Sequence, residues 1–150
     1  MATTETVKWH GARVNTRLKL SALWSTVMFF YVYADLFAFF DPKSLRLLMD
    51  GTLLPFPITQ PMMLGMAVMM SIPTIMVFVS LALKASQSRW LNIVVGVVYT
   101  LVAAYTVAMP SSLAYRYFES LEILFTGYIV WSAWKWPAQR AAARYSAEQI

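Results

Sequence analysis

The sequence predicts an all-α integral membrane protein: a single domain built as a four-transmembrane-helix bundle. Charged residues make up 13% of the chain and hydrophobic residues 59%, whereas an ordinary soluble domain has roughly 25% charged residues. Four apolar stretches each reach the roughly 20 residues that a helix needs to cross a bilayer. Stretches of this length without a barrel's alternation must be helices, because no backbone donor can stay unpaired in hydrocarbon.

The predicted spans are joined by short links, apart from the first link. They are expected at about residues 21–40, 62–84, 90–109 and 114–136, followed by a cytoplasmic tail over 137–150. The chain contains no cysteine, which excludes disulfides and thiolate metal sites. Because the spans follow one another closely, all 150 residues are assigned to one membrane domain.

The first link, residues 41–61, carries four of the seven prolines. Ser44 is expected to cap a short interfacial helix over LRLLM, which ends at Asp50 and Gly51. The prolines would then return the chain in an extended conformation. This Pro-rich outer loop is expected to be a lid, a docking surface or a plain connector.

Pro73 lies in the middle of the second predicted span. Proline has no backbone N–H, so we expect it to kink this helix. Ser71 and Thr74 flank it, and their hydroxyls are expected to help satisfy the carbonyl that it leaves unpaired.

Lysine and arginine residues predict the orientation. Nine of the twelve lie in or beside the N-terminal segment, the link between the second and third spans, and the tail; three lie on the other side. The positive-inside rule then places both termini in the cytoplasm. This topology, with some help from anionic lipid, explains the net charge of +5, so no nucleic-acid partner is implied. The tryptophans agree, because all six are expected at the cytoplasmic interface: Trp9, Trp24, Trp90, Trp131, Trp134 and Trp136.

Three carboxylates are expected inside the outer half of the bundle. Asp35 lies roughly 7 Å below the outer end of its helix, at 1.5 Å per residue. Glu119 falls about as deep, Glu122 lies one turn deeper, and Arg116 lies near the surface. An acid at the bilayer centre costs about 2.5 to 3.5 kcal/mol, so three acids at this depth indicate a role.

Two explanations of these acids stay open. In the structural one, Arg116 pairs with Asp35 or Glu119, and tyrosine hydroxyls complete a network that fixes which helices are neighbours. In the functional one, surplus negative charge leaves a carboxyl that is protonated or awaits a cation, which suits a proton relay, a cation site or a general acid. The expected ligand or ion pocket consists of Asp35, Glu119, Glu122, Arg116, Tyr31, Tyr115 and Thr126.

Two further patterns indicate partners. Met62, Met66 and Met69 share a helix face, and thioethers favour Cu(I), but Met also fills irregular apolar space. No cysteine supports a copper site and the single histidine, His10, lies on the other side of the membrane, so no metal or cofactor is expected. A stripe of small residues in the third span could pack against another helix, a second copy or a partner subunit: Gly96, Thr100, Ala104 and Ala108.

Several stretches resemble a group of small bacterial membrane proteins classified as a domain of unknown function, with a four-helix layout similar to DoxX-like proteins. They are LSALWSTVMFFYVYADLFAFFDP, IPTIMVFVSLALKASQSRWLNIVVG and YRYFESLEILFTGYIVWSAWKW. The likeness covers about residues 20–136, and its matching positions are Ala34-Asp35, Ile72-Pro73, Arg89-Trp90, Asn92 and Glu122. Many relatives have further glycines and a histidine beside the proline before the last span; this chain has MPSSLAYRY there. The resemblance implies a multi-pass protein of the bacterial inner membrane and no particular activity.

Three functions remain as hypotheses. The leading one is binding or passage of a small cationic or protonatable solute at the outward-facing acidic pocket. The second is a membrane enzyme in which Glu122 donates a proton to an apolar lipid or isoprenoid, while aromatic faces stabilise a developing cation. The third is a non-catalytic subunit of a larger membrane complex.

Overall fold

The computed structural model describes residues 14–53 and 56–136, and this part of the chain is almost wholly helical. Its helices are α1 (Thr16–Phe40), α2 (Pro42–Met49), α3 (Gln60–Ala82), α4 (Ala85–Val107) and α5 (Leu113–Trp134). The all-α prediction is therefore confirmed. The predicted tail and the predicted position of Trp9 lie outside the described residues.

The four long helices coincide with the four predicted spans, and the largest shifts are at their starts. α1 begins at Thr16, earlier than predicted, because the Asn15 side chain accepts a hydrogen bond from the Arg17 N–H at 3.0 Å and caps the helix. Among the described residues, α1, α3 and α4 are long and apolar enough to cross a membrane. α5 is 22 residues long but carries charged side chains in its first half, and it is not one of these three.

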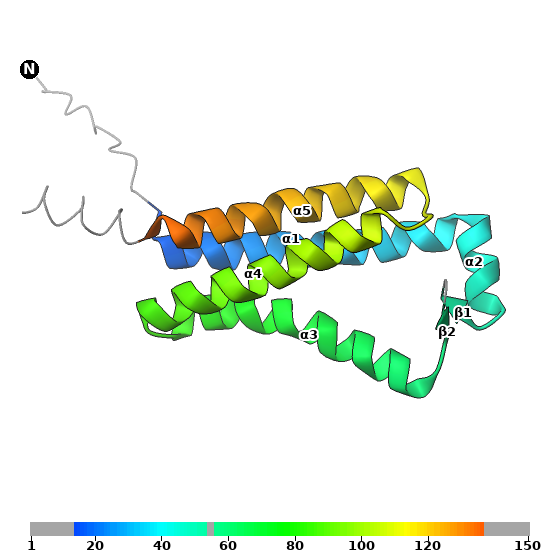
Figure 1. The fold of residues 1–150 in the computed structure, drawn as a ribbon, viewed down its shortest axis with the longest axis horizontal. Helices are drawn as coiled ribbons and strands as arrows, with labels where there is room; N and C mark the ends of the chain where they lie inside the picture. Colours follow the sequence, from blue (N-terminus) through cyan, green and yellow to red (C-terminus); the bar gives the residue numbers. More distant parts are fainter. Residues whose placement is uncertain (1–13, 54–55, 137–150) are drawn as a thin grey trace, which may run out of the picture.

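The long helices run alternately up and down. Figure 1 places the start of α1, the turn between α3 and α4 and the end of α5 at one end of the molecule, and α2 with the link between α4 and α5 at the other. We call these the terminal end and the α2 end. α4 packs most extensively on α5, and α1 packs on both α5 and α3.

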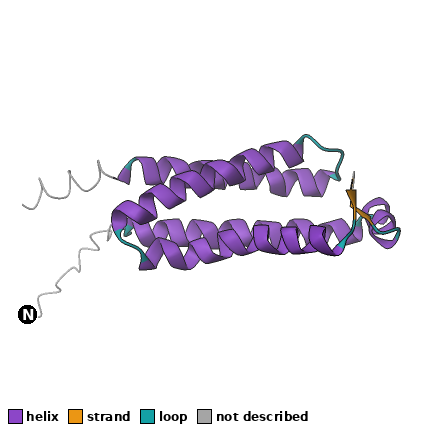
Figure 2. Cartoon of the chain, turned by 60° about the horizontal axis from the view of Figure 1, so that its bottom comes forward, coloured by secondary structure: helices purple, strands orange, loops and turns teal. Residues whose placement is uncertain are grey.

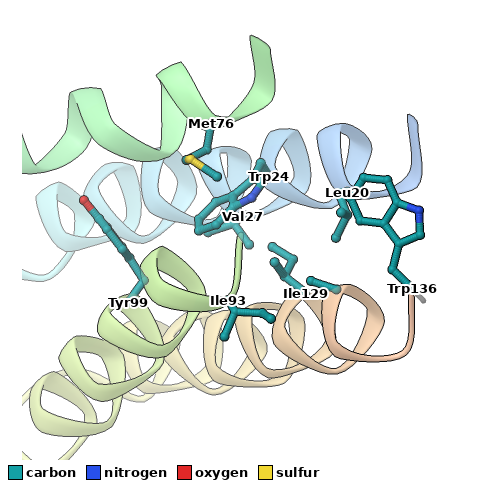
Figure 3. Close-up of a cluster of buried hydrophobic side chains, with 9 residues drawn as sticks. Leu20, Trp24, Val27, Met76, Ile93, Tyr99, Ile129 and Trp136 are labelled. Carbon is teal, nitrogen blue, oxygen red and sulfur yellow. The ribbon is translucent and has the colours of Figure 1, made fainter. Parts of the chain in front are cut away.

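The apolar core lies in the half of the bundle nearer the terminal end. It consists of Leu20, Trp24, Val27, Met76, Ile93, Tyr99, Ile129, Ala133 and Trp136 (Figure 3). The Trp24 and Tyr99 rings form a T-shaped pair, with centroids 6.1 Å apart. All four long helices contribute to this core, which fixes their order around the bundle.

Large apolar side chains also cover the outside of the bundle. Phe29 on α1, Phe78 on α3, Leu101 on α4 and Leu124 on α5 are 61%, 71%, 65% and 66% exposed. Soluble monomers rarely expose apolar surface on this scale. Together with the three helices able to span a bilayer, this surface indicates a membrane protein.

A polar network lies beside the core and joins three helices. The Trp24 ring N–H on α1 donates to the Asn92 side-chain oxygen on α4 at 2.7 Å, and the Ser80 hydroxyl on α3 donates to the same oxygen at 3.2 Å. The Asn92 amide in turn donates to the Ser88 carbonyl at 2.7 Å. All four side chains are completely buried. This network satisfies its own members, so it holds the helices together.

Two of the tryptophans expected at the membrane interface are buried inside the bundle. Trp24 bonds Asn92 inside the core, and Trp136 is buried against Leu20. Position along the chain predicts how deep a side chain lies, but it does not show which face of a helix is covered by its neighbours. The exposed tryptophans are Trp90, Trp131 and Trp134.

The loop at the α2 end differs from the prediction in two respects. Asp41, rather than Ser44, caps α2: its carboxylate accepts hydrogen bonds from the Ser44 N–H at 3.0 Å and the Ser44 hydroxyl at 2.6 Å. Pro42 occupies the first turn, where its missing N–H does no harm. The returning chain is extended, as predicted, but it also pairs with itself, which was not predicted: β1 (Thr52–Leu53) and β2 (Phe56–Pro57) are two short antiparallel strands (Figure 2).

α3 separates from its neighbours toward its N-terminal end (Figure 1). Its buried residues, Pro73, Met76 and Ser80, all lie in the second half of the helix. None of residues 60–72 is buried. We call residues 60–72 the divergent half of α3.

Pro73 directly follows the divergent half of α3 and cannot make the backbone hydrogen bond that a helical residue normally donates. A side chain of another helix replaces this bond. In a regular helix the N–H of residue 73 would donate to the carbonyl of Met69, and proline has no N–H. The Tyr99 hydroxyl of α4 donates to this Met69 carbonyl oxygen instead. A residue of α4 therefore stabilises α3 at the point where Pro73 interrupts its backbone hydrogen bonds.

Ser71 and Thr74 do not satisfy the Met69 carbonyl, so the prediction that their hydroxyls do so is wrong. Their hydroxyls donate to the carbonyls of Ala67 and Met70. Hydroxyls inside a helix reach the carbonyl four residues back. For neither residue is that carbonyl the one that Pro73 leaves unpaired.

Candidate functional site

Two glutamates of α5 point into the bundle. Glu119 and Glu122 are each 2% exposed. Both oxygens of Glu119, and Oε1 of Glu122, are buried without a hydrogen-bond partner among the described residues. Buried polar groups are almost always hydrogen-bonded. Both oxygens of Glu119 and one oxygen of Glu122 depart from this rule, one helical turn apart on α5.

The other predicted side chains gather around these two acids. Glu119 and Asp35 lie close enough to Glu122 to interact with it electrostatically. Tyr115 lies within the same range of all three acids, and Tyr31 lies within range of both glutamates. The Tyr31 hydroxyl is also buried without a partner. The structure thus brings together five of the seven predicted pocket residues, which we call the acid–tyrosine cluster.

Arg116 does not neutralise the cluster by a direct pair. It is exposed on α5 and close enough to Glu119 to act on it electrostatically, but Glu119 accepts no hydrogen bond from it. The Thr106 hydroxyl of α4 lies beside Glu119 as well. This hydroxyl is within hydrogen-bonding reach of Glu119, and also of the backbone carbonyls of Val102 and Ala103, which compete for its single hydrogen. Among the described residues, the Glu119 carboxyl group therefore has at most this one shared donor.

Asp35 differs from the glutamates because it is exposed. It lies two turns beyond Met28 on the same face of α1. The Met28 sulfur lies 3.5 Å from the Thr74 hydroxyl of α3, so this face of α1 is turned toward α3. Asp35 therefore lies where the divergent half of α3 leaves α1 uncovered.

Thr126, the seventh predicted residue, lies at the base of the cluster. It is fully buried, donates to the Glu122 carbonyl at 2.7 Å and accepts a 2.8 Å bond from the Thr100 hydroxyl. These bonds occupy its hydroxyl. Thr126 thus joins α5 to α4 below the acids.

Part of the stripe of small residues on α4 packs against α5. A Cβ at Gly96 would lie 2.7 Å from Val130 Cγ2 of α5, so this glycine allows α4 and α5 to approach each other closely. Thr100 faces α5 as well, whereas Ala104 and Ala108 are exposed. The stripe therefore divides into an inner part that packs on α5 and an outer part open to the surroundings.

Tyr99 is the residue of the site that sequence reasoning missed. It bonds Met69 at the break in α3, and its ring lies 6.5 Å from the Tyr31 ring at 71°. Pro73 gave the signal that a donor was needed. The sequence does not reveal that the donor comes from α4, because that depends on how α3 and α4 pack.

The methionines predicted to share a face lie in the divergent half: Met62 and Met69 are half-buried, and Met66 is exposed. Among the described residues, no group of three or more His, Cys, Asp and Glu side chains could hold a metal ion. His10 lies outside the described residues.

Comparison with known proteins gives a family but no activity. DUF6326, a family of unknown function, matches residues 4–143. The chain belongs to this family. No curated protein and no solved structure matches it.

Proposed function

We propose that this protein binds, or lets pass, a small cationic or protonatable solute at a pocket formed by the acid–tyrosine cluster. One observation carries the proposal: Glu119 and Glu122 are almost completely buried, yet both oxygens of Glu119 and Oε1 of Glu122 make no regular hydrogen bond to the described residues. A buried charge that is neither paired nor hydrogen-bonded is very costly. A proton or a bound cation would remove this cost.

The same proposal includes a membrane topology. α5 forms the fourth span: its 22 residues extend about 33 Å at 1.5 Å per residue, close to the roughly 30 Å of a bilayer core. Leu124 and Trp131 face outward from α5, as expected of a lipid-facing surface. Both termini lie in the cytoplasm of a bacterial cell, as the positive-inside rule requires. The cluster then opens toward the outer leaflet, and the layout is similar to DoxX-like proteins.

The test is a charge-displacement measurement on the purified full-length chain in liposomes adsorbed to a solid-supported membrane. A concentration jump of ammonium or tetramethylammonium should give a saturable current, whether the cation only binds or also crosses. Glu119→Gln with Glu122→Gln should abolish the current. The matched control is Asp50→Asn, an exposed acid in the loop after α2, which should leave it unchanged. Equal currents from all three proteins would refute the proposed function.

A second candidate is proton-transfer chemistry on an apolar lipid. It is favoured by the aromatic side chains that flank Glu122 on α5: Phe118 and Phe125 both contact Phe30 of α1, with centroids 6.5 and 5.2 Å away. This candidate predicts that lipid extracts of the purified protein contain one hydrophobic molecule at close to stoichiometric amount. Extracts with bulk lipid alone would count against it. A role as a non-catalytic subunit would instead use the exposed Ala104 and Ala108, and gentle solubilisation should then give a larger assembly.

A further inference from the structure

We propose that the ligand of the acid–tyrosine cluster is a hydrophobic organic monocation, with an aromatic or alkyl group beside its ammonium head. This inference rests on the proposed function and adds the substrate class. Three features of the site support it: its charge, its rings and its open side.

The charge of the site favours a positive ligand. Glu122 interacts electrostatically with Glu119 and with Asp35, and Arg116, the basic residue close to Glu119, makes no hydrogen bond with it. The site therefore offers unpartnered carboxyl oxygens from α5 and an exposed carboxylate from α1. A ligand with one positive charge would gain an attraction that no side chain in contact supplies.

The rings of the site favour an organic ammonium over a small hydrated ion. Tyr31 and Tyr115 lie beside the glutamates. The Tyr99 ring meets Tyr31 at 6.5 Å. Aromatic faces attract organic cations, and aromatic cages are a recurrent way to recognise quaternary ammonium groups. The unpartnered Tyr31 hydroxyl adds a hydrogen-bonding group for a ligand head.

The open side of the site is apolar and adaptable. Asp35 is exposed on the face of α1 that turns toward α3, and residues 60–72 of α3 do not cover it. This divergent half carries the methionine-rich stretch MMLGMAVMM. Methionine is flexible and polarizable, and it recurs at surfaces that accept ligands of varied shape. The Met side chains thus suit the apolar part of the ligand while the acids hold its charge.

The inference is tested with three probes on the full-length protein in detergent, by isothermal titration calorimetry at low salt. Benzyltrimethylammonium carries the charge and a ring, tetramethylammonium carries the same head without the ring, and benzenesulfonate is an aromatic anion. Benzyltrimethylammonium should bind at least about tenfold more tightly than tetramethylammonium, and benzenesulfonate should give no binding heat. Glu122→Gln should weaken benzyltrimethylammonium binding by about tenfold or more, whereas Asp50→Asn should not change it.

The outcomes separate the two proposals. Equal or tighter binding of tetramethylammonium would overturn the hydrophobic class and leave the proposed function intact. Binding of neither cation would overturn both. Binding of benzenesulfonate as tight as that of benzyltrimethylammonium would show that the ring alone is recognised and overturn the inference. The probe comparison uses the unchanged protein, so it stands even where a substitution impairs folding.

Discussion

The hydrogen bond from Tyr99 to Met69 gives the sharpest test of how α3 is held. Tyr99→Phe removes one hydroxyl and keeps the ring, so the core packing with Trp24 is retained. The Met69 carbonyl then has no donor, because Pro73 cannot supply one. Leaving a fully buried acceptor unpaired costs about 1–3 kcal/mol, and side-chain hydrogen bonds measured in membranes reach about 1.7 kcal/mol; the Tyr99–Met69 bond is only partly buried, so its loss falls in the lower part of this range. We therefore expect a loss of about 1.5 kcal/mol in the free energy of unfolding.

A double-mutant cycle isolates this bond. In a Pro73→Ala background, the new N–H of residue 73 can donate to Met69, so Tyr99→Phe should cost no more than about 0.5 kcal/mol. The assay is unfolding in mixed micelles followed by tryptophan fluorescence. The matched control is Tyr105→Phe, the same change on an exposed residue of α4, which should be neutral. An equal cost of Tyr99→Phe in both backgrounds would refute the reasoning.

Two further predictions concern packing and capping. Gly96→Ala would place a Cβ 2.7 Å from Val130 Cγ2 and should lower the free energy of unfolding by about 1–3 kcal/mol. In the matched control, Gly127→Ala, the added Cβ meets nothing within 4 Å, so this change should be neutral or stabilising. Equal effects of the two changes in a denaturation assay would contradict the close approach of α4 and α5. The Ser44 hydroxyl and backbone N–H hold the pKa of Asp41 below its usual range, so the cap of α2 should persist above about pH 4 and be lost as the pH falls below that value. The ¹³C chemical shifts of α2 would report this loss, and Asp41→Ala should show the low-pH shifts already at neutral pH; unchanged shifts in that variant would refute the role of the cap.

The sequence predicted the long helices well because their boundaries have local causes. Apolar runs end at prolines and polar turns, and these features act over a few residues. The cap of α2 was misplaced for a local reason as well: Asp41 and Pro42 form the stronger start signal, since proline suits the first turn and aspartate suits the residue before it. Such an error is correctable from the sequence.

The site was predictable in its membership but not in its bonding. The spacing of Glu119, Glu122 and Thr126 placed them on one inner face, and the structure buries all three. The expected bond to Arg116 is missing, because a long exposed side chain can turn outward. The bonds of Trp24 and Tyr99 cross between helices, so they follow from how the helices pack rather than from any one segment.

The most direct test of the central claim is the unfolding free energy of Glu119→Gln and Glu122→Gln at neutral pH, with Asp50→Asn as control. If the two buried acids serve a ligand rather than the fold, neutralising them should leave stability unchanged or raise it, because no partner loses a bond. A fall of about 3–5 kcal/mol, as expected when a buried pair is broken, would show that the acids are structural and contradict the account.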